Sequence, residues 1–410
     1  MSTRGGPVTV RAAAQRGPRW LWVIVFVAAA PALLEGVDSN LFAFGGPFIV
    51  HDVHATVASL GLLATGYALG IAVFSLVGGY LFDRISVKGT VLVSVVIFAG
   101  ATLWTGLSST LPELFISRFL VGIGVGMFQP ALVALLGDIL WETRSRAISV
   151  FALFFQGGIF VAPLFEARFL PAYRVPFLVA SAVALVLLVI FYTVIPKTYK
   201  TQEAARVPLR GLMNRNVVVL SLSVLFFGVA LFGFTGYFSA YLLKGLGMAP
   251  GVAAPIAGAA GLGGFLCAFP IGYLADRFGR KPLLVVAAVL VMVGSFGMFL
   301  VSRDIAGLVL STAAFGAGWG SIVHLVAALG QDSVPDAVAG SVTGWMFMAF
   351  NVGAMVGGPL FAAFLGHGYV TAGLVTLGGA SVLSFGLALS ARPVTESNVI
   401  ADPIPTNASV

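Results

Sequence analysis

Gly272-Tyr273-Leu274-Ala275-Asp276-Arg277 repeats, 193 residues further along the chain, the earlier run Gly79-Tyr80-Leu81-Phe82-Asp83-Arg84. Each copy stands at the end of a long apolar stretch. Repetition at about half the chain length, in a chain this hydrophobic, is typical of secondary transporters, which are often built from two related halves. The sequence therefore predicts two related halves and a function in transport, not in catalysis.

The composition places the chain in a membrane. Of its 410 residues 59% are hydrophobic and only 9% are charged, so there are too few polar groups to cover a soluble surface. The single cysteine, Cys267, excludes an internal disulfide and lies in an apolar run, where we expect a small core residue. The net charge of +7 could indicate an anionic partner, so its meaning depends on where the charges lie.

Twelve apolar runs are long enough to span a bilayer, and they fall into two sets of six. They predict an all-α membrane protein with twelve transmembrane helices in two six-helix pseudo-repeat bundles. The first set covers 19–46, 57–82, 89–108, 112–137, 145–166 and 174–195, and the second covers 217–243, 251–276, 282–301, 305–329, 338–364 and 369–390. The predicted parts are an N-terminal tail (1–18), an N-terminal bundle (19–196), a linker (197–216), a C-terminal bundle (217–390) and a C-terminal tail (391–410).

The basic residues predict the orientation. If the N-terminus is cytoplasmic, 17 of the 22 Lys and Arg residues fall in cytoplasmic segments and four fall on the opposite side. By the positive-inside rule both termini are then cytoplasmic, in a multi-pass protein of the cell inner (plasma) membrane. The basic linker is read first as a topology signal, and a regulatory or lipid-binding role is the alternative.

The second copy of the repeat continues as Phe278-Gly279-Arg280-Lys281, and this whole run resembles the loop motif of the major facilitator superfamily. In that family the motif lies between helices two and three and again between helices eight and nine. The first copy departs from it, with Ser86 where the second glycine would be. The resemblance covers essentially all twelve helices and implies two bundles around a central cavity that opens alternately to each side.

The motif also predicts a cytoplasmic gate, because a carboxylate followed by basic residues offers ion pairs that can break and reform. The alternative is that the acids are simple helix-end charges with arginine partners. The residues expected in this gate are Gly79, Asp83, Arg84, Gly272, Asp276, Arg277 and Arg280.

Ionisable groups within the apolar runs are candidate functional residues, because an unpaired charge there costs several kcal/mol. Glu35 and Asp38 lie three residues apart, nearly on one helix face. Two neighbouring carboxylates resist joint ionisation, so one is expected to keep a proton. Arg118 lies at a similar depth from the outer side. The resemblance to the superfamily implies that the first and fourth helices face each other, so we expect an Asp38–Arg118 pair with Glu35 beside it. These three are the candidate proton-coupling residues, and a permanent ion pair that only fixes packing is the alternative.

The run Leu34-Glu35-Gly36-Val37-Asp38 resembles the helix-one signature of the aromatic acid:proton symporter branch. In those relatives the helix-one acids are needed for proton-linked uptake of small organic acids. The resemblance implies that role for Glu35 and Asp38.

Four further polar or aromatic residues are candidates for binding substrate together with Arg118. Gln156 and Asn351 occupy matching mid-helix positions, where an amide facing lipid would be costly. His324 could bind substrate or a proton, or could instead be satisfied by a backbone carbonyl. Tyr237 could stack on a planar substrate, although packing explains any one aromatic residue as well.

These features favour a secondary active transporter working by alternating access, which symports protons with a small organic acid such as a monocarboxylate or aromatic acid. A proton-driven efflux antiporter for hydrophobic or cationic compounds is the alternative, weakened because Ala162 precedes Pro163 in the helix-five motif. A receptor that has lost transport is a third reading. No nucleotide site, catalytic triad or metal cluster is recognisable, so we expect no enzyme activity and no cofactor. The expected partners are a small-molecule substrate, protons and the lipid bilayer, without nucleic acid, for a monomer.

Overall fold

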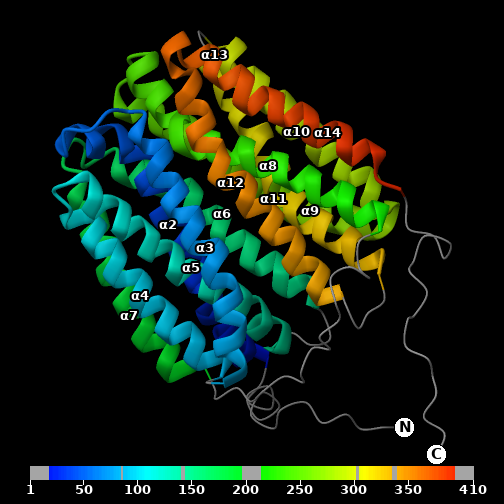
Figure 1. Cartoon of the computed structure of the whole chain (residues 1–410). Coiled ribbons are helices and arrows are strands. Elements are labelled where there is room, and N and C mark those ends of the chain that lie inside the picture. The colour runs from blue at the N-terminus through cyan, green and yellow to red at the C-terminus, as the bar shows by residue number, and fades with distance from the viewer. Residues whose placement is uncertain are drawn as a thin grey trace, which may run out of the picture.

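A computed structural model describes residues 18–84, 86–139, 144–195, 214–301, 304–334 and 339–392 (Figure 1). All secondary structure in these ranges is helical. Three short helical turns interrupt or follow the α-helices: η3 (Tyr241–Gly245), η5 (Leu365–His367) and η6 (Leu374–Gly378). The α-helices are α2 (Pro18–Asp52), α3 (Ser59–Arg84), α4 (Val87–Leu107), α5 (Leu111–Ile139), α6 (Arg144–Glu166), α7 (Arg174–Val194), α8 (Arg215–Ala240), α9 (Pro250–Phe278), α10 (Arg280–Leu300), α11 (Ile305–Asp332), α12 (Ala339–Phe364), α13 (Tyr369–Gly373) and α14 (Gly379–Ser390).

Ten helical spans within the described ranges are long and apolar enough to cross a membrane. The described parts of α3 and α6 add two shorter apolar stretches, Ser59–Ser75 and Val150–Glu166. The protein is therefore an all-helical, multi-pass membrane protein. The count of twelve spanning helices stays a prediction.

The first helix differs from its expected range of 19–46. It continues through Pro47 to Asp52, because Ile49 and Val50 in its last two turns are fully buried against other helices. Packing of these apolar residues offsets the backbone hydrogen bond that proline cannot donate.

Successive helices run in alternate directions, so the molecule has two ends. We call one the Asp52 end, which holds Asp52, Ser108, Arg174 and His367, and the other the Asp332 end, which holds Lys88, Asn216, Arg280 and Asp332.

The helices form two groups that lie side by side (Figure 1). Helices α2 to α7, coloured blue to green, pack among themselves, as do α8 to α14, coloured green to red. Between the groups, α3 packs on α12 and α6 packs on α9, while α2 and α3 both contact α8. The exact boundaries of the two expected bundles stay a prediction, since 1–17, 196–213 and 393–410, which hold nearly all of the tails and the linker, are outside the described residues.

Glycines allow the helices of the two groups to approach each other closely. A Cβ on Gly61 of α3 would lie 2.7 Å from the carbonyl carbon of Gly358 on α12, and a Cβ on Gly261 of α9 would lie 2.3 Å from the amide nitrogen of Phe160 on α6. Any larger residue would overlap backbone atoms at either contact. Small residues at helix crossings are how membrane helices approach closely.

At the Asp52 end a polar cluster ties α2 to α7. The Tyr173 hydroxyl and an Arg174 guanidinium nitrogen each donate a hydrogen bond of 2.8 Å to Oδ2 of Asp52. Burial, followed by this hydrogen bond, raises the pKa of Tyr173 to about 12, so the phenol keeps its proton and acts as a donor.

Candidate functional site

A cavity of about 650 Å³ lies between the two helix groups. It extends toward the Asp332 end, where Gln331 and Gly344 on its wall are exposed. Its size suits one small organic molecule. The ionisable and amide side chains among the described lining residues are Glu35, Asn40, Tyr67, Arg118, Gln129, Gln156, His324, Gln331 and Asn351.

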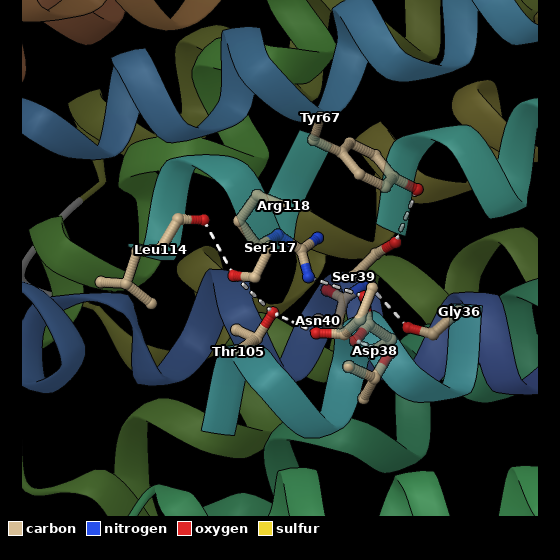
Figure 2. A network of polar contacts seen from close by, with 11 residues as sticks. Gly36, Asp38, Ser39, Asn40, Tyr67, Thr105, Leu114, Ser117 and Arg118 are labelled. Carbon is tan, nitrogen blue, oxygen red and sulfur yellow. Dashed lines mark hydrogen bonds and ion pairs between the residues drawn. The ribbon is translucent and has the colours of Figure 1, made fainter. Parts of the chain in front are cut away.

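Behind the cavity wall, a buried ion pair joins α2 to α5. Nη1 of Arg118 donates to Oδ2 of Asp38 over 2.8 Å, and these side chains are 2% and 0% exposed (Figure 2). Oδ1 of Asp38 accepts a second bond of 2.8 Å from the Thr102 hydroxyl on α4. Two donors, from α5 and α4, are thus aimed at this carboxylate. The pair expected from the matching depths of Asp38 and Arg118 is thus present.

The arginine, and not the aspartate, faces the cavity. Its guanidinium carbon lies 4.5 Å from the ring centre of Phe42 and 4.9 Å from that of Tyr67, so the cation is held between two aromatic rings. Tyr67 is in turn positioned by Ser39, with 3.2 Å between the two hydroxyl oxygens (Figure 2). Nε of Arg118 is buried and has no hydrogen-bond partner among the described residues. The cation therefore retains a donor that no described residue satisfies.

Glu35 occupies the cavity wall one helical turn before Asp38. Its Oε1 accepts a hydrogen bond of 2.6 Å from Nε2 of Gln129 on α5, and its Oε2 is buried without a partner in the described structure. Within the described ranges, Glu35 therefore pairs with an amide, and Arg118 forms its ion pair with Asp38. The two acids differ in both partner and exposure to the cavity.

The other candidate binding residues do not all reach the cavity. Gln156 and Asn351 line it, and Oε1 of Gln156 and Oδ1 of Asn351 are buried without a partner in the described ranges. His324 also lines it, with Nδ1 3.3 Å from the carbonyl oxygen of Gly320, one helical turn away. This contact agrees with the alternative that a backbone carbonyl satisfies His324. It involves Nδ1 and not Nε2.

The expectation that Tyr237 binds substrate needs correction, because Tyr237 is not among the residues that line the cavity and instead holds the Asp52 end closed. Its hydroxyl accepts from the amide of Gly61 over 2.9 Å and donates to the carbonyl of Ala58 over 2.8 Å. Its ring stacks on Phe361, with 4.4 Å between ring centres. Nearby, the Thr65 hydroxyl donates to the carbonyl of Met355 over 2.9 Å. These contacts join α3 to α8 and α12, across the two helix groups.

We expect Tyr237→Phe to loosen the Asp52 end without unfolding the protein. The change keeps the stacked ring but removes both hydrogen bonds, each of which contributes about 0.5–1.5 kcal/mol. The ratio of open to closed Asp52 ends should rise about 5- to 150-fold, which corresponds to the loss of about 1–3 kcal/mol. Spin labels at the exposed residues Thr56 and Gly366, one on each helix group, would report it as a new population at longer distance. An unchanged distance distribution would contradict this role for Tyr237.

The gate residues of the repeated motif are only partly described. The side chains of Asp83, Arg84 and Asp276 and the surroundings of Gly79 and Gly272 lie outside the described part of the structure, so the role of these five residues stays a prediction. Arg277 is exposed and lies over the ring of Phe278. Arg280 pairs with Asp332 over 2.5 Å and donates to the carbonyl of Ala328 over 2.9 Å. The described part of the gate therefore links the start of α10 to the end of α11, at a surface where one ion pair contributes at most about 1 kcal/mol.

The family is decided by comparison with known proteins. A family model described as Major Facilitator Superfamily matches residues 21–359 and 258–402. The chain belongs to the major facilitator superfamily. It is therefore a transport protein and not an enzyme, as expected from the repeated motif.

Individual relatives of this superfamily member are distant. The chain is 28% identical over 157 residues to the 4-hydroxybenzoate transporter PcaK of Pseudomonas putida, a match that spans 38% of this chain and 35% of that protein. It is 24% identical to the hexuronate transporter of Bacillus subtilis (strain 168), over 90% of this chain and 92% of that one. It is also 24% identical to the multidrug efflux pump LfrA of Mycolicibacterium smegmatis, over 89% and 85%. A crystal structure of a D-xylose-proton symporter has the same fold, with a TM-score of 0.74 at 18% identity over 93% of this chain and all of that one.

Several residues of the site were missed by inspection of the sequence. Gln129, which binds Glu35, could have been found as a third amide inside an apolar run, beside Pro130. Thr102 carries no such signal, because hydroxyls are common in these helices and bond to their own backbone. Glu166 was treated as a helix end, yet it is fully buried.

Proposed function

We propose that this protein is a secondary active transporter that couples protons to the symport of a small organic acid by alternating access. The observation that carries the proposal is the buried Asp38–Arg118 pair, in which the acid lies behind the cavity wall and the cation lies on it. Such a pair is a switch with two charge states, since one proton on the acid releases the base.

The coupling follows from charge balance. While Asp38 is ionised, its carboxylate neutralises Arg118 and the site has no need of another anion. Once Asp38 is protonated, Arg118 is a buried cation without a counter-ion, which strongly disfavours the empty site. A substrate carboxylate can then replace Asp38 at the guanidinium, whose unpaired Nε and freed Nη1 offer two donors. Proton and monoanion enter together because their charges cancel, so the net charge of the site is unchanged.

The rest of the wall favours a monocarboxylate or an aromatic acid. Arg118 is the single lysine or arginine among the described lining residues, so a second carboxylate would have no cationic partner. Phe155 and Trp319 meet edge to face, with 6.0 Å between ring centres, and both line the cavity. These rings, with the amides of Gln156 and Asn351, suit a planar molecule that carries hydroxyl groups. The names of relatives as 4-hydroxybenzoate and hexuronate transporters support a carboxylate cargo.

We place the Asp332 end in the cytoplasm, with both termini on that side of the inner membrane. The excess of Lys and Arg in the segments of that end supports this orientation. With twelve spanning helices in two six-helix bundles, the described arrangement, open toward the Asp332 end and tied at the Asp52 end, corresponds to an inward-facing state of a monomeric transporter.

Proton-driven efflux of hydrophobic or cationic compounds is the second candidate. The unpaired Oε2 of Glu35 supports it, since this acid lies on the cavity wall and could attract a cation. The similarity to the efflux pump LfrA supports it as well. In this reading Glu35, and not Arg118, meets the cargo.

Transport by purified protein in liposomes separates the two candidates. An inward-directed pH gradient should drive accumulation of 4-hydroxybenzoate or another monocarboxylate, and release of a lipophilic cation such as ethidium should not respond. If the gradient drives ethidium transport and no carboxylate uptake, the efflux proposal replaces the symport proposal. Absence of both would overturn the proposal of proton-coupled transport for these cargoes.

We expect Arg118→Lys to impair carboxylate binding at least tenfold. Lysine keeps the charge but loses both the planar contact with Phe42 and Tyr67 and the paired donors of the guanidinium. The measurement is the KM for carboxylate uptake, with Arg174→Lys as the control, because Arg174 forms a surface pair with Asp52 outside the cavity. A KM equal to that of the unaltered protein would show that Arg118 does not meet substrate.

A further inference from the structure

We propose that Glu166 is a second proton-binding group, at the opposite end of the molecule from the gate, which holds a proton while the Asp52 end is closed. Its link to a transport cycle rests on the proposed function, whereas its protonation in the closed state does not. The proposal starts from the position of the residue, which is the last of α6.

The Glu166 side chain is buried, and no described residue forms a hydrogen bond with it. It is 0% exposed, and neither carboxyl oxygen makes a hydrogen bond with the described residues, although the amide of Gly45 lies beside it. An ionised carboxylate in such a place loses its hydration without replacement, which costs several kcal/mol. A protonated carboxyl avoids most of that cost.

The α2 helix leaves room for this carboxyl. A Cβ on Gly45 would lie 2.1 Å from Oε1 of Glu166 and 3.0 Å from its carboxyl carbon. Any other residue at position 45 would therefore overlap the acid. In the described arrangement, the carboxyl of Glu166 thus lies directly against α2, where glycine leaves space for it.

The ionisable groups of the helices that pack on α6 are engaged elsewhere or lie far along the chain. On α2, Asp52 binds Tyr173 and Arg174, Asp38 binds Arg118, Glu35 binds Gln129, and His51 is exposed. On α5, Glu113 accepts from the amide of Ser109. The part of α9 at this end, 250–266, contains no ionisable residue. Arg168, just beyond α6, and Lys244 of η3 are exposed, and the Lys244 amine lies over the ring of Phe48. None of these cations forms an ion pair with Glu166.

Opening of the Asp52 end would change this environment. α6 packs against α9 of the other helix group, so separation of the groups at this end removes the cover on one side of the α6 terminus. Water would then reach Glu166 and allow it to ionise. The closed end binds one more proton than the open end, so acidification favours closure.

Infrared difference spectra of the purified full-length protein test the protonation directly, without substrate. The band from the carbonyl stretch of buried protonated carboxyls should be present at neutral pH in the unaltered protein and should lose the contribution of one carboxyl in Glu166→Gln, which keeps the shape of the side chain. Glu113→Gln, at a half-buried carboxylate of the same end that accepts a hydrogen bond from the amide of Ser109, should leave the band in place. A spectrum of Glu166→Gln that retains the full band would overturn the proposal.

The linkage to closure has its own measurement. With spin labels at Thr56 and Gly366, the closed-to-open ratio should rise as pH falls, by up to about tenfold per pH unit for one linked proton. Glu166→Gln should remove that dependence and stay closed, whereas Asp38→Asn should keep it. If the pH dependence persists in Glu166→Gln, the linkage is overturned. If it is lost in Asp38→Asn instead, the linked proton belongs to the proposed transport site and not to Glu166.

Discussion

Replacing Asp38 by asparagine should abolish accumulation driven by a pH gradient while substrate exchange across the membrane continues. Asparagine resembles the protonated acid, so Arg118 is released permanently and the site behaves as if it always carried its proton. Exchange of labelled for unlabelled carboxylate needs no net proton movement and should persist. Gradient-driven accumulation should fall at least tenfold, to the level reached without a gradient.

The stability of this variant has to be measured beside its transport. Removal of one member of a buried ion pair costs about 3–5 kcal/mol when the other charge stays in place. Circular dichroism and size-exclusion profiles of Asp38→Asn therefore accompany the assay, and added substrate should restore part of the lost stability by supplying the missing anion. Glu113→Gln is the control, as an acid outside the cavity. Gradient-driven accumulation that survives in a folded Asp38→Asn protein would refute coupling through Asp38.

Replacing Gly61 by valine should stop transport by preventing closure of the Asp52 end. Even a Cβ at this position would lie 2.7 Å from the carbonyl carbon and oxygen of Gly358 and 2.8 Å from the hydroxyl oxygen of Tyr237. Two of these atoms are backbone and cannot move away without shifting α12. We expect the helix groups to stay apart at this end, with uptake and exchange both lost.

The same pair of spin labels, at Thr56 and Gly366, distinguishes this block from misfolding. A folded Gly61→Val protein should show the longer distance alone, in place of a mixture. The matched control is Gly251→Val, since a Cβ on Gly251, on α9 at the same end, meets no atom within 4 Å. Normal uptake by Gly61→Val would mean that α3 and α12 do not need this close approach.

The all-helical architecture was predictable because hydropathy and a repeated motif act over whole segments. Apolar runs of spanning length and the 193-residue repeat identify the helices and the family without any side-chain geometry. The extension of α2 to Asp52 was missed because proline at position 47 was given more weight than the burial of Ile49 and Val50 that follows it.

The part of the candidate site that was predictable is the ion pair, because the depth of a charged residue in the membrane indicates which opposite charge it can reach. Asp38 and Arg118 are charged groups at similar depths in helices expected to face each other, and they pair. Which way a neutral side chain points depends on the rotation of its helix, which hydropathy does not fix in a bundle that is apolar on most faces. Tyr237 was consequently assigned to substrate while it ties α8 to α3, and Gln129 was overlooked.

The uneven distribution of charge around the cavity has a consequence for how such a protein can change. Both charged lining groups, Glu35 and Arg118, come from the first helix group, whereas the second group contributes aromatic rings, amides and His324 to the described wall. The charged part of the wall is thus encoded in the first stretch of the gene, together with Phe155 and Gln156, while the second stretch adds further uncharged contacts and His324. Recombination that exchanges the second stretch would change the uncharged part of the cavity wall and leave Glu35 and Arg118 in place. Chimeras joined in the linker are therefore a direct route to altering what this protein carries.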